Sequence, residues 1–332
     1  MSSRTSSAPE SLQRDAFVAR KEQLYGWLIT MSAAFTVFVT LGIVLTLAWH
    51  AASFFTEVPL LDFLTGTTWS PKISGDFGVL PLVSGTLIVT VGSAAIALPV
   101  GLAAAIYLSE YASERARSVL KPALEILAGV PTVIYGFMAL VYLTPLIDSV
   151  LPIAVPVIPA GLPVPEFTFV VPSLRTFNAL SASIVVGIMI IPMVSSISED
   201  ALRAVPDSLR EAAYGLGSTK FDVSTKVVVP SATSGIVASY VLALSRAIGE
   251  TMAVTMAMGM SPQMPYFPNV LRNLAESSQT MTAAMIQISS ADSLGGVSYD
   301  ALFAIGIALF AITLAMNLLA ELVRRHFREA YE

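Results

Sequence analysis

Six long apolar runs constrain this chain more than any other feature of its sequence. They cover about residues 27–49, 79–108, 122–147, 179–197, 231–260 and 300–323. An α-helix rises about 1.5 Å per residue, so about 20 apolar residues cross the hydrocarbon core of a bilayer. Only 12% of the residues are charged, about half the share found in soluble domains. The sequence therefore predicts an all-α integral membrane protein with six transmembrane helices.

The residue types that most reaction chemistries need are scarce. The chain has no cysteine, which excludes disulfides, thiol nucleophiles and thiolate metal sites. Its two histidines, His50 and His326, stand at the ends of apolar runs and assemble neither a metal site nor a catalytic triad. A net charge of -5 gives no support for nucleic-acid binding. The chain also lacks the glycine-rich phosphate loop of an ATPase. We therefore expect a protein that is not an enzyme, with no catalytic residues and no metal site.

Basic residues are distributed unevenly over the two sides that six spans define. Of the 18 lysines and arginines, 14 fall on the side of the termini, three fall on the opposite side, and Arg246 lies within a span. Because basic loops stay in the cytoplasm, we predict that both termini are cytoplasmic. The predicted organisation is a cytoplasmic N-terminal segment at 1–24, a six-span domain at 25–323 and a cytoplasmic tail at 324–332.

A polar segment at 198–230 joins the fourth and fifth runs on the predicted cytoplasmic side. Residues 201–216 are expected to form a short helix, on which Glu211, Ala212 and Ala213 give a small-residue face for close docking. Gly215 and Gly217 permit a turn after it, since glycine adopts positive φ without a steric cost. Such a helix on a tight turn is suited to transmit motion from a soluble partner. From the residues alone, the 198–230 segment can also be a solvated connector that binds no partner.

The spacing within this segment resembles a known signature. Glu211, Ala212 and Ala213 are followed at fixed distances by Gly217 and Pro230, as in the EAA signature of ABC importer permeases. Val227 and Val229 stand where that signature usually has isoleucine and leucine, and we expect no functional consequence. The resemblance implies a type I ABC importer permease fold. It also implies that the 198–230 loop holds a coupling helix seated on an ATPase subunit.

The wider sequence, from about residue 78 to the end of the sixth run, resembles the permease subunit of the phosphate-specific ABC importer. Residues 125–136, 188–192, 210–217 and 246–254 carry this resemblance. It implies a bacterial inner-membrane subunit that forms half of a pathway for inorganic phosphate. Its implied partners are a second, related permease, two ATPase subunits that bind the ATP and magnesium, and an extracytoplasmic phosphate-binding protein. This chain is expected to bind no cofactor.

The same resemblance implicates Arg246 and Glu250 in phosphate passage. Four residues apart, they are expected to share a helix face and to bond to each other. A structural salt bridge is the alternative. Against it, arginine offers a planar fork that matches phosphate oxygens, and charge within the membrane usually faces a pathway. Thr132 and Tyr135 follow a Gly-Val-Pro break. They are expected either to line the phosphate path or to serve only in packing. Glu125 is expected to pair with Lys121.

Three rival functions remain at this point. One keeps the family but changes the cargo to molybdate, sulfate or phosphonate, and the identity of the binding protein distinguishes it. A secondary transporter is a second rival, but it predicts inverted repeats, and it leaves the EAA spacing unexplained. A structural or signalling subunit is the third. The proline-rich loop at 148–177 is expected outside the cell, where it can contact the binding protein.

Overall fold

The structure is a computed structural model that describes residues 16–151, 153–156, 168–171, 173–267, 269–290 and 296–329. The predictions for residues 1–15, for residues 157–167 of the proline-rich loop and for residues 330–332 lie outside this part. Helices dominate the described residues, which contain only two short antiparallel hairpins, β1–β2 and β3–β4.

In chain order the helices are α1 (Ala16–Glu57), α2 (Leu60–Thr65), α3 (Leu80–Ile106), α4 (Glu114–Gly129), α5 (Thr132–Met138), α6 (Thr144–Asp148), α7 (Ala179–Arg203), α8 (Asp207–Gly215), α9 (Lys220–Val223), α10 (Val229–Ser231), α11 (Thr233–Gly249), α12 (Met252–Met258), α13 (Val270–Ala275), α14 (Met281–Ser289) and α15 (Val297–Glu329). Three π-helical turns, η2 (Tyr107–Tyr111), η3 (Ala139–Leu143) and η4 (Ser224–Val228), and the strands β1 (Trp69–Ser70), β2 (Asp76–Phe77), β3 (Ile153–Pro156) and β4 (Thr168–Val171) complete the described elements.

Four helices, α1, α3, α7 and α15, are each long and apolar enough to cross a membrane. Two further candidate spans are bent pairs of helices. One joins α4 to the α5–α6 segment with an 88° bend, and the other joins the α9–α10 segment to α11 with a 71° bend. The described part of the chain therefore holds four spans, or up to six if each bent pair crosses once.

Two of the predicted runs are broken. In the third, Pro131 restricts the residue before it to extended backbone, and Val130 ends α4 with ψ 131°. The fifth run, predicted as one span at 231–260, divides at Glu250, which is also extended with ψ 131°. The hydroxyl of Thr282 donates to the carbonyl oxygen of Glu250 at 3.0 Å. A neighbouring element thus satisfies a carbonyl that the break releases, as a helix broken within a membrane requires.

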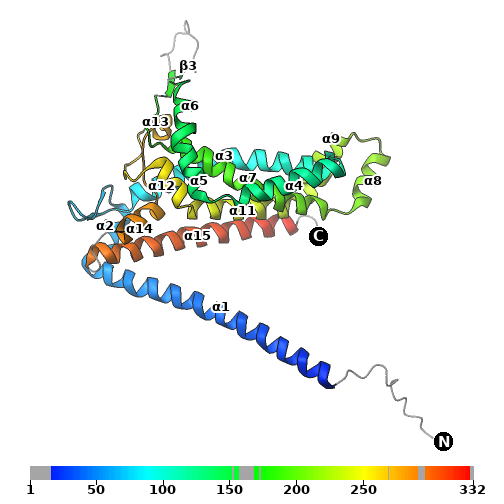
Figure 1. Ribbon diagram of the computed structural model, residues 1–332, viewed down its shortest axis with the longest axis horizontal. Helices are drawn as coiled ribbons and strands as arrows, with labels where there is room; N and C mark the ends of the chain where they lie inside the picture. Colours follow the sequence, from blue (N-terminus) through cyan, green and yellow to red (C-terminus); the bar gives the residue numbers. More distant parts are fainter. Residues whose placement is uncertain are drawn as a thin grey trace, which may run out of the picture.

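The core of the bundle is the close contact between α3 and α7, which run side by side (Figure 1). Small residues make this approach possible. A Cβ atom on Gly92 would lie 2.4 Å from the Ser183 hydroxyl, and one on Gly101 would lie 2.7 Å from Val194. The glycine- and alanine-rich helix α3 thus packs closely against α7. Without a hydrophobic force between helices in lipid, such close contact is what holds them together.

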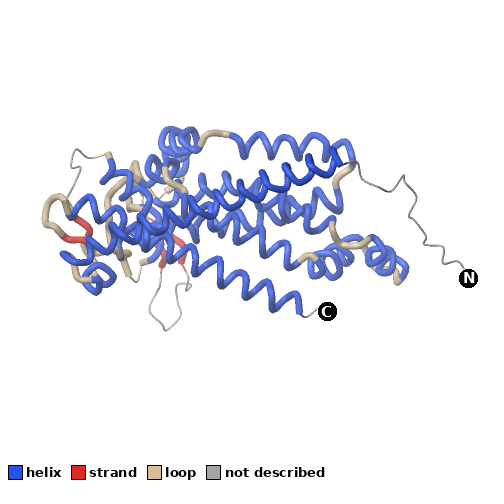
Figure 2. The backbone as a smooth tube through the Cα atoms, turned by 90° about the horizontal axis from the view of Figure 1, so that it is seen from below, coloured by secondary structure: helices blue, strands red, loops and turns tan. Residues whose placement is uncertain are grey.

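The two ends of the bundle differ in character. Helices α8 and α9 lie at one end, called the α8 end below, whereas α2 and α14 lie at the other, the α14 end (Figure 1). The long helices run between these ends, and most loops gather at the α14 end (Figure 2). There, Phe54, Phe63, Trp69 and Phe77 form an aromatic cluster that ties α1 to the first hairpin. From there α1 diverges from the bundle, and the side chains of residues 20–40 are all exposed.

Candidate functional site

The segment predicted to dock a partner is folded rather than a loose connector. Helix α8 is followed by a turn, α9 and η4, which lead into α10 and α11. On its inner side, Leu202, Ala213, Val223 and Val228 are buried together with residues of α3 and α11. This packing fixes α8 on the bundle.

Arg210 fastens α8 to the end of α3. One guanidinium nitrogen lies 3.0 Å from Glu110 Oε1 in η2, and the same nitrogen donates to the carbonyl oxygen of Leu202 at 2.8 Å. The other terminal nitrogen donates to the carbonyl oxygen of Val205 at 2.6 Å. A positive charge thereby binds one carbonyl in the last turn of α7 and one in the link that follows it, as helix C-termini favour. The Glu110 side chain is 6% exposed, so this is a largely buried ion pair.

Replacing Arg210 by methionine is expected to destabilise the folded chain by about 3–5 kcal/mol, because it leaves the buried carboxylate of Glu110 without its cation. The measurement is the thermal unfolding midpoint in detergent, followed by tryptophan fluorescence. Asp207→Asn is the matched control. That carboxylate pairs with the same guanidinium at 3.2 Å but is 89% exposed, and its loss should cost less than about 1 kcal/mol. Equal shifts in the two variants would contradict the anchoring role of Arg210.

The two glycines after the docking face differ in conformation. Gly217 has φ 81° and lies in a Schellman turn, in which Ser218 N–H donates to the Ala213 carbonyl at 3.2 Å and Gly217 N–H to that of Tyr214 at 2.9 Å. Gly217 therefore adopts the positive φ that its position predicts. Gly215 does not: it is the last residue of α8 and has no positive φ. Only one of the two glycines is needed for the turn.

The outer face of this segment combines small residues with large apolar side chains. Glu211 and Ala212 are exposed, whereas Ala213 turns inward and is buried. Around them stand exposed large side chains: Leu209, Tyr214, Leu216 and Phe221. An exposed apolar patch at the tip of a helical pair is typical of an interaction site. The structure thus divides the predicted docking residues, with Glu211 and Ala212 available for contact and Ala213 part of the support.

A cavity of about 370 Å³ lies between α4, α7 and α11. Its charged lining residues are Lys121 and Glu125 from α4, Glu199 from α7 and Arg246 from α11. Much of the remaining wall is apolar and includes the adaptable side chains of Met189 and Met193. Arg246 has no ion-pair or hydrogen-bond partner within the described residues. Its side chain is exposed and lines the cavity wall.

The expected pairing of Arg246 with Glu250 is wrong. Helix α11 ends at Gly249, so the two side chains do not share a helix face. Glu250 belongs instead to the start of α12, where its Oε1 accepts a hydrogen bond from the Ala253 N–H at 3.3 Å. Its side chain is buried at the break and does not line the Arg246 cavity. The two residues therefore have separate environments.

The other predicted pathway residues lie outside the cavity wall. The hydroxyl of Tyr135 donates to the Leu127 carbonyl at 2.8 Å, which ties α5 to α4 across the break. Thr132 is the first residue of α5 and is half-buried. Glu125 lines the cavity, but Lys121 pairs with Glu199 and Asp200, so the expected Lys121–Glu125 pair is also wrong. These contacts agree with a packing role for Tyr135.

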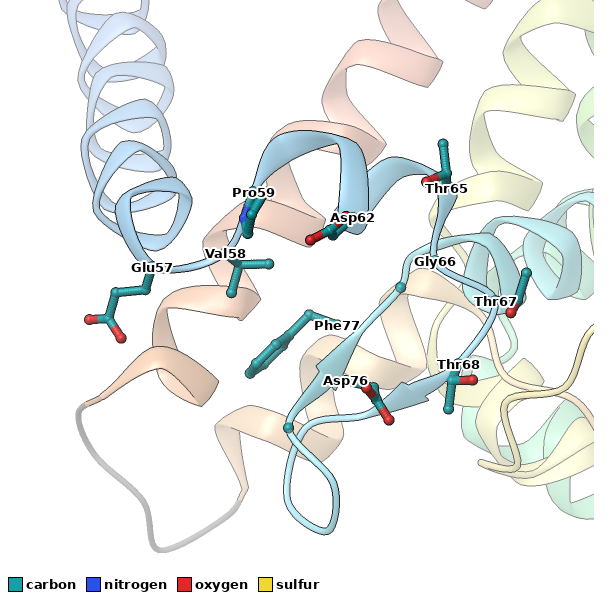
Figure 3. A pocket seen from close by; sticks show the side chains of 12 residues that line it. Glu57, Val58, Pro59, Asp62, Thr65, Gly66, Thr67, Thr68, Asp76 and Phe77 are labelled. Atoms are coloured by element: carbon teal, nitrogen blue, oxygen red, sulfur yellow. The ribbon is translucent and has the colours of Figure 1, made fainter.

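A second hollow, at the α14 end, has a net negative charge (Figure 3). It encloses about 470 Å³ and is lined by the carboxylates of Glu57, Asp62 and Asp76, with no basic residue in its wall. An anion would be repelled there. Of these two cavities, charge favours the smaller one around Arg246 for an anionic ligand.

Sequence reasoning missed the ion pairs at the α8 end. Glu199 is completely buried and is paired with Arg117, Lys121 and Arg203. The sequence held two signs of these ion pairs. An acidic pair, Glu199 and Asp200, stands at the end of the fourth apolar run, and a cluster of basic residues precedes the third run. Nothing in the sequence shows that these two segments meet.

Comparisons with known proteins agree with this geometry. Residues 97–329 match the family described as "Binding-protein-dependent transport system inner membrane component". The phosphate transport system permease protein PstC of Mesorhizobium japonicum is 32% identical, over 88% of this chain and 86% of that protein. The PstC protein of Haemophilus influenzae is 35% identical, over 79% of this chain and 80% of that protein.

The fold also occurs in a solved structure, a bacterial ABC transporter involved in the import of the acidic polysaccharide alginate. One of its chains aligns with a TM-score of 0.57 and 15% identity, covering 93% of this chain and 97% of that chain. At this identity the likeness shows the fold alone. With these matches and several apolar helices, the chain is a multi-pass membrane protein of the type I ABC importer permease fold, and it belongs to the family of inner membrane components of binding-protein-dependent transport systems.

Proposed function

We propose that this chain is the permease subunit of an ATP-driven importer for inorganic phosphate and forms half of its translocation pathway. In this proposal the α8 end faces the cytoplasm, together with both termini. The partners are a second, related permease, two ATPase subunits that bind ATP and magnesium, and an extracytoplasmic phosphate-binding protein. Two relatives that match most of the chain are named as phosphate transport permeases, which supports this cargo.

The observation that carries the cargo assignment is Arg246 in its cavity, where it has no ion-pair or hydrogen-bond partner among the described residues. A charge within a membrane protein is costly unless it serves a pathway or has a partner. A planar guanidinium suits a phosphate oxyanion because it can donate two parallel hydrogen bonds. Arg246 is therefore proposed to bind phosphate during passage.

The α8 segment supports the coupling assignment. Its outer face presents Ala212 beside Leu209 and Tyr214, which suits close docking into a cleft of an ATPase subunit. Its inner face is fastened to α3 through Arg210 and Glu110. Motion of the ATPase is thus proposed to reach α3, α7 and the Arg246 cavity through this rigid connection.

Glu250 receives a different proposed role from the one that its spacing suggested. Its carboxylate caps the α12 backbone at the break in the fifth run, and its carbonyl is bound by Thr282 of α14. We propose that Glu250 acts on transport by fixing this break, just beyond Arg246, rather than by holding the guanidinium. Thr132 and Tyr135 are proposed to shape the neighbouring break in the third run.

The proposed function is tested by ATP hydrolysis of the complex that copurifies with the tagged chain in lipid. Phosphate-loaded binding protein should stimulate hydrolysis, whereas sulfate and molybdate should not. An ATPase that copurifies but responds only to another oxyanion would keep the importer and change its cargo. If no ATPase copurifies and none restores uptake when added, the importer assignment is wrong and a secondary transporter becomes the better explanation.

A further inference from the structure

The buried carboxylate of Glu199 has more cations around it than one carboxylate requires. Its side chain is 0% exposed. Arg117 binds Oε1, Lys121 Nζ lies 3.1 Å from Oε2, and an Arg203 nitrogen lies 3.9 Å from Oε1. If Lys121 left, Arg117 and Arg203 would still balance the charge of Glu199 through Oε1, whereas Oε2 would lose its ion-pair partner. A buried carboxylate that lost all its cations would be strongly destabilising, but one that loses a surplus cation is not.

Lys121 is the surplus cation that faces open space. It lines the Arg246 cavity, whereas Arg117 and Arg203 do not, and its side chain is 29% exposed. Its other contact is the exposed carboxylate of Asp200, at 3.3 Å, and exposed pairs of this kind contribute little. A lysine ammonium is a compact charge on a flexible stem. Lys121 can therefore exchange one anionic partner for another without backbone movement.

Lys121 and Arg246 lie at different depths of the same cavity. A hydrogen bond of 2.7 Å between the Ser198 and Ser239 hydroxyls sets the register of α7 against α11. Arg246 lies seven residues beyond Ser239, about 10 Å farther from the α8 end. Glu199, which holds Lys121, directly follows Ser198. An anion that moves from Arg246 toward the α8 end therefore meets Lys121 next.

The charged side chains that line the cavity balance one another. Lys121 and Arg246 supply two positive charges, and Glu125 and Glu199 supply two negative charges, of which Glu199 is also paired with Arg117 and Arg203 outside the cavity wall. Lys121 and Arg246 are therefore the two cations that an oxyanion in the cavity can contact. Glu125, on the same wall, would repel the anion and keep its binding weak. A pathway needs such weak binding, since an ion must leave each site as readily as it enters.

We propose that Lys121 forms a second anion subsite in the pathway, between Arg246 and the α8 end, that binds oxyanions such as inorganic phosphate. Lys121 turns from Glu199 to the anion as it arrives, and returns to Glu199 as it leaves. Glu199 is a positioning residue that holds Lys121 at the cavity wall between passages. The subsite rests on the proposed function for its place in transport, but not for anion binding itself.

The first test measures binding without turnover. Because the chain has no cysteine, Met193→Cys places a single thiol on the cavity wall. Its modification by a methanethiosulfonate reagent is followed on this chain, in the intact complex, with and without inorganic phosphate. Phosphate should slow the modification. Lys121→Gln in the same background should raise the phosphate concentration needed for half-maximal protection about tenfold, the factor that corresponds to one charge-assisted hydrogen bond. Equal protection with and without Lys121, or none at all, would overturn the subsite.

The second test measures uptake of phosphate into proteoliposomes. Lys121→Gln should raise KM about tenfold, with assembly unchanged. Lys121→Arg should return KM most of the way to the value of the unchanged chain. Arg203→Gln is the control for an indirect effect through Glu199, because it also removes a cation from Glu199 but none from the cavity, and its KM should rise much less than that of Lys121→Gln. If both glutamine variants raise KM equally, Lys121 only stabilises Glu199 and the subsite is wrong. Protection of the thiol without any uptake would instead support the subsite and contradict the proposed transport function.

Discussion

Arg246→Gln is expected to reduce kcat/KM for phosphate uptake by roughly tenfold to a hundredfold, because hydrogen bonds to a charged group contribute about 1.5–3 kcal/mol. Glutamine keeps much of the volume but loses the positive charge and the two-pronged donor. The kcat/KM of Arg246→Lys should lie between that of the unchanged chain and that of Arg246→Gln, because lysine keeps the positive charge but lacks the planar fork. The measurement is uptake of labelled phosphate by proteoliposomes that contain the whole complex.

The variant should still assemble, because no ion pair of the described residues depends on Arg246. Ser245→Ala is its matched control. The Ser245 hydroxyl donates to Asn317 of α15 at 3.0 Å and does not line the cavity, so uptake should change by less than about twofold for one exposed neutral hydrogen bond. Normal uptake by Arg246→Gln would remove Arg246 from the anion path and leave the cargo assignment without its main support.

Gly217→Val is expected to uncouple ATP hydrolysis from transport. A β-branched residue at φ 81° is strained by at least about 1–2 kcal/mol. The Schellman turn should therefore open and displace Leu216 and Phe221 on the docking face. Phosphate-stimulated ATP hydrolysis and uptake should both fall roughly tenfold or more, the factor that corresponds to about 1.4 kcal/mol. Basal hydrolysis by the ATPase subunits themselves should persist.

Gly215→Ala is the control for this variant. Gly215 lies at the end of α8 with no positive φ, and no atom lies within 4 Å of the position of an added Cβ. Alanine also favours the helix by up to about 1 kcal/mol relative to glycine. Coupling should therefore be unchanged. If Gly215→Ala uncouples as strongly as Gly217→Val, the effect comes from bulk on the docking face rather than from the turn.

The sequence was informative wherever a property depends on neighbours along the chain. Apolar run length predicted the helices α1, α3, α7 and α15, since crossing a bilayer depends on local composition. The positive φ of Gly217 followed from the turn that its position requires.

The sequence failed where a charge is paired by a distant segment. Spacing put Arg246 and Glu250 on one helix face, but backbone at Glu250 is extended, and a break of one residue changes every contact beyond it. Lys121 was assigned to Glu125, four residues away, and pairs instead with Glu199, on another helix. Local spacing favours the nearest partner, whereas burial selects the partner that leaves no charge unpaired.

The sequence by itself thus determined the class of protein and the four apolar segments that are each long enough to cross a membrane. Both follow from composition and hydrophobic length. Only the tertiary structure decided that Arg246 has no partner among the described residues, that it shares a cavity with Lys121, and that Arg210 fastens α8 to Glu110. These depend on which helices pack together, and close packing is set by contacts over the whole bundle rather than by any one segment.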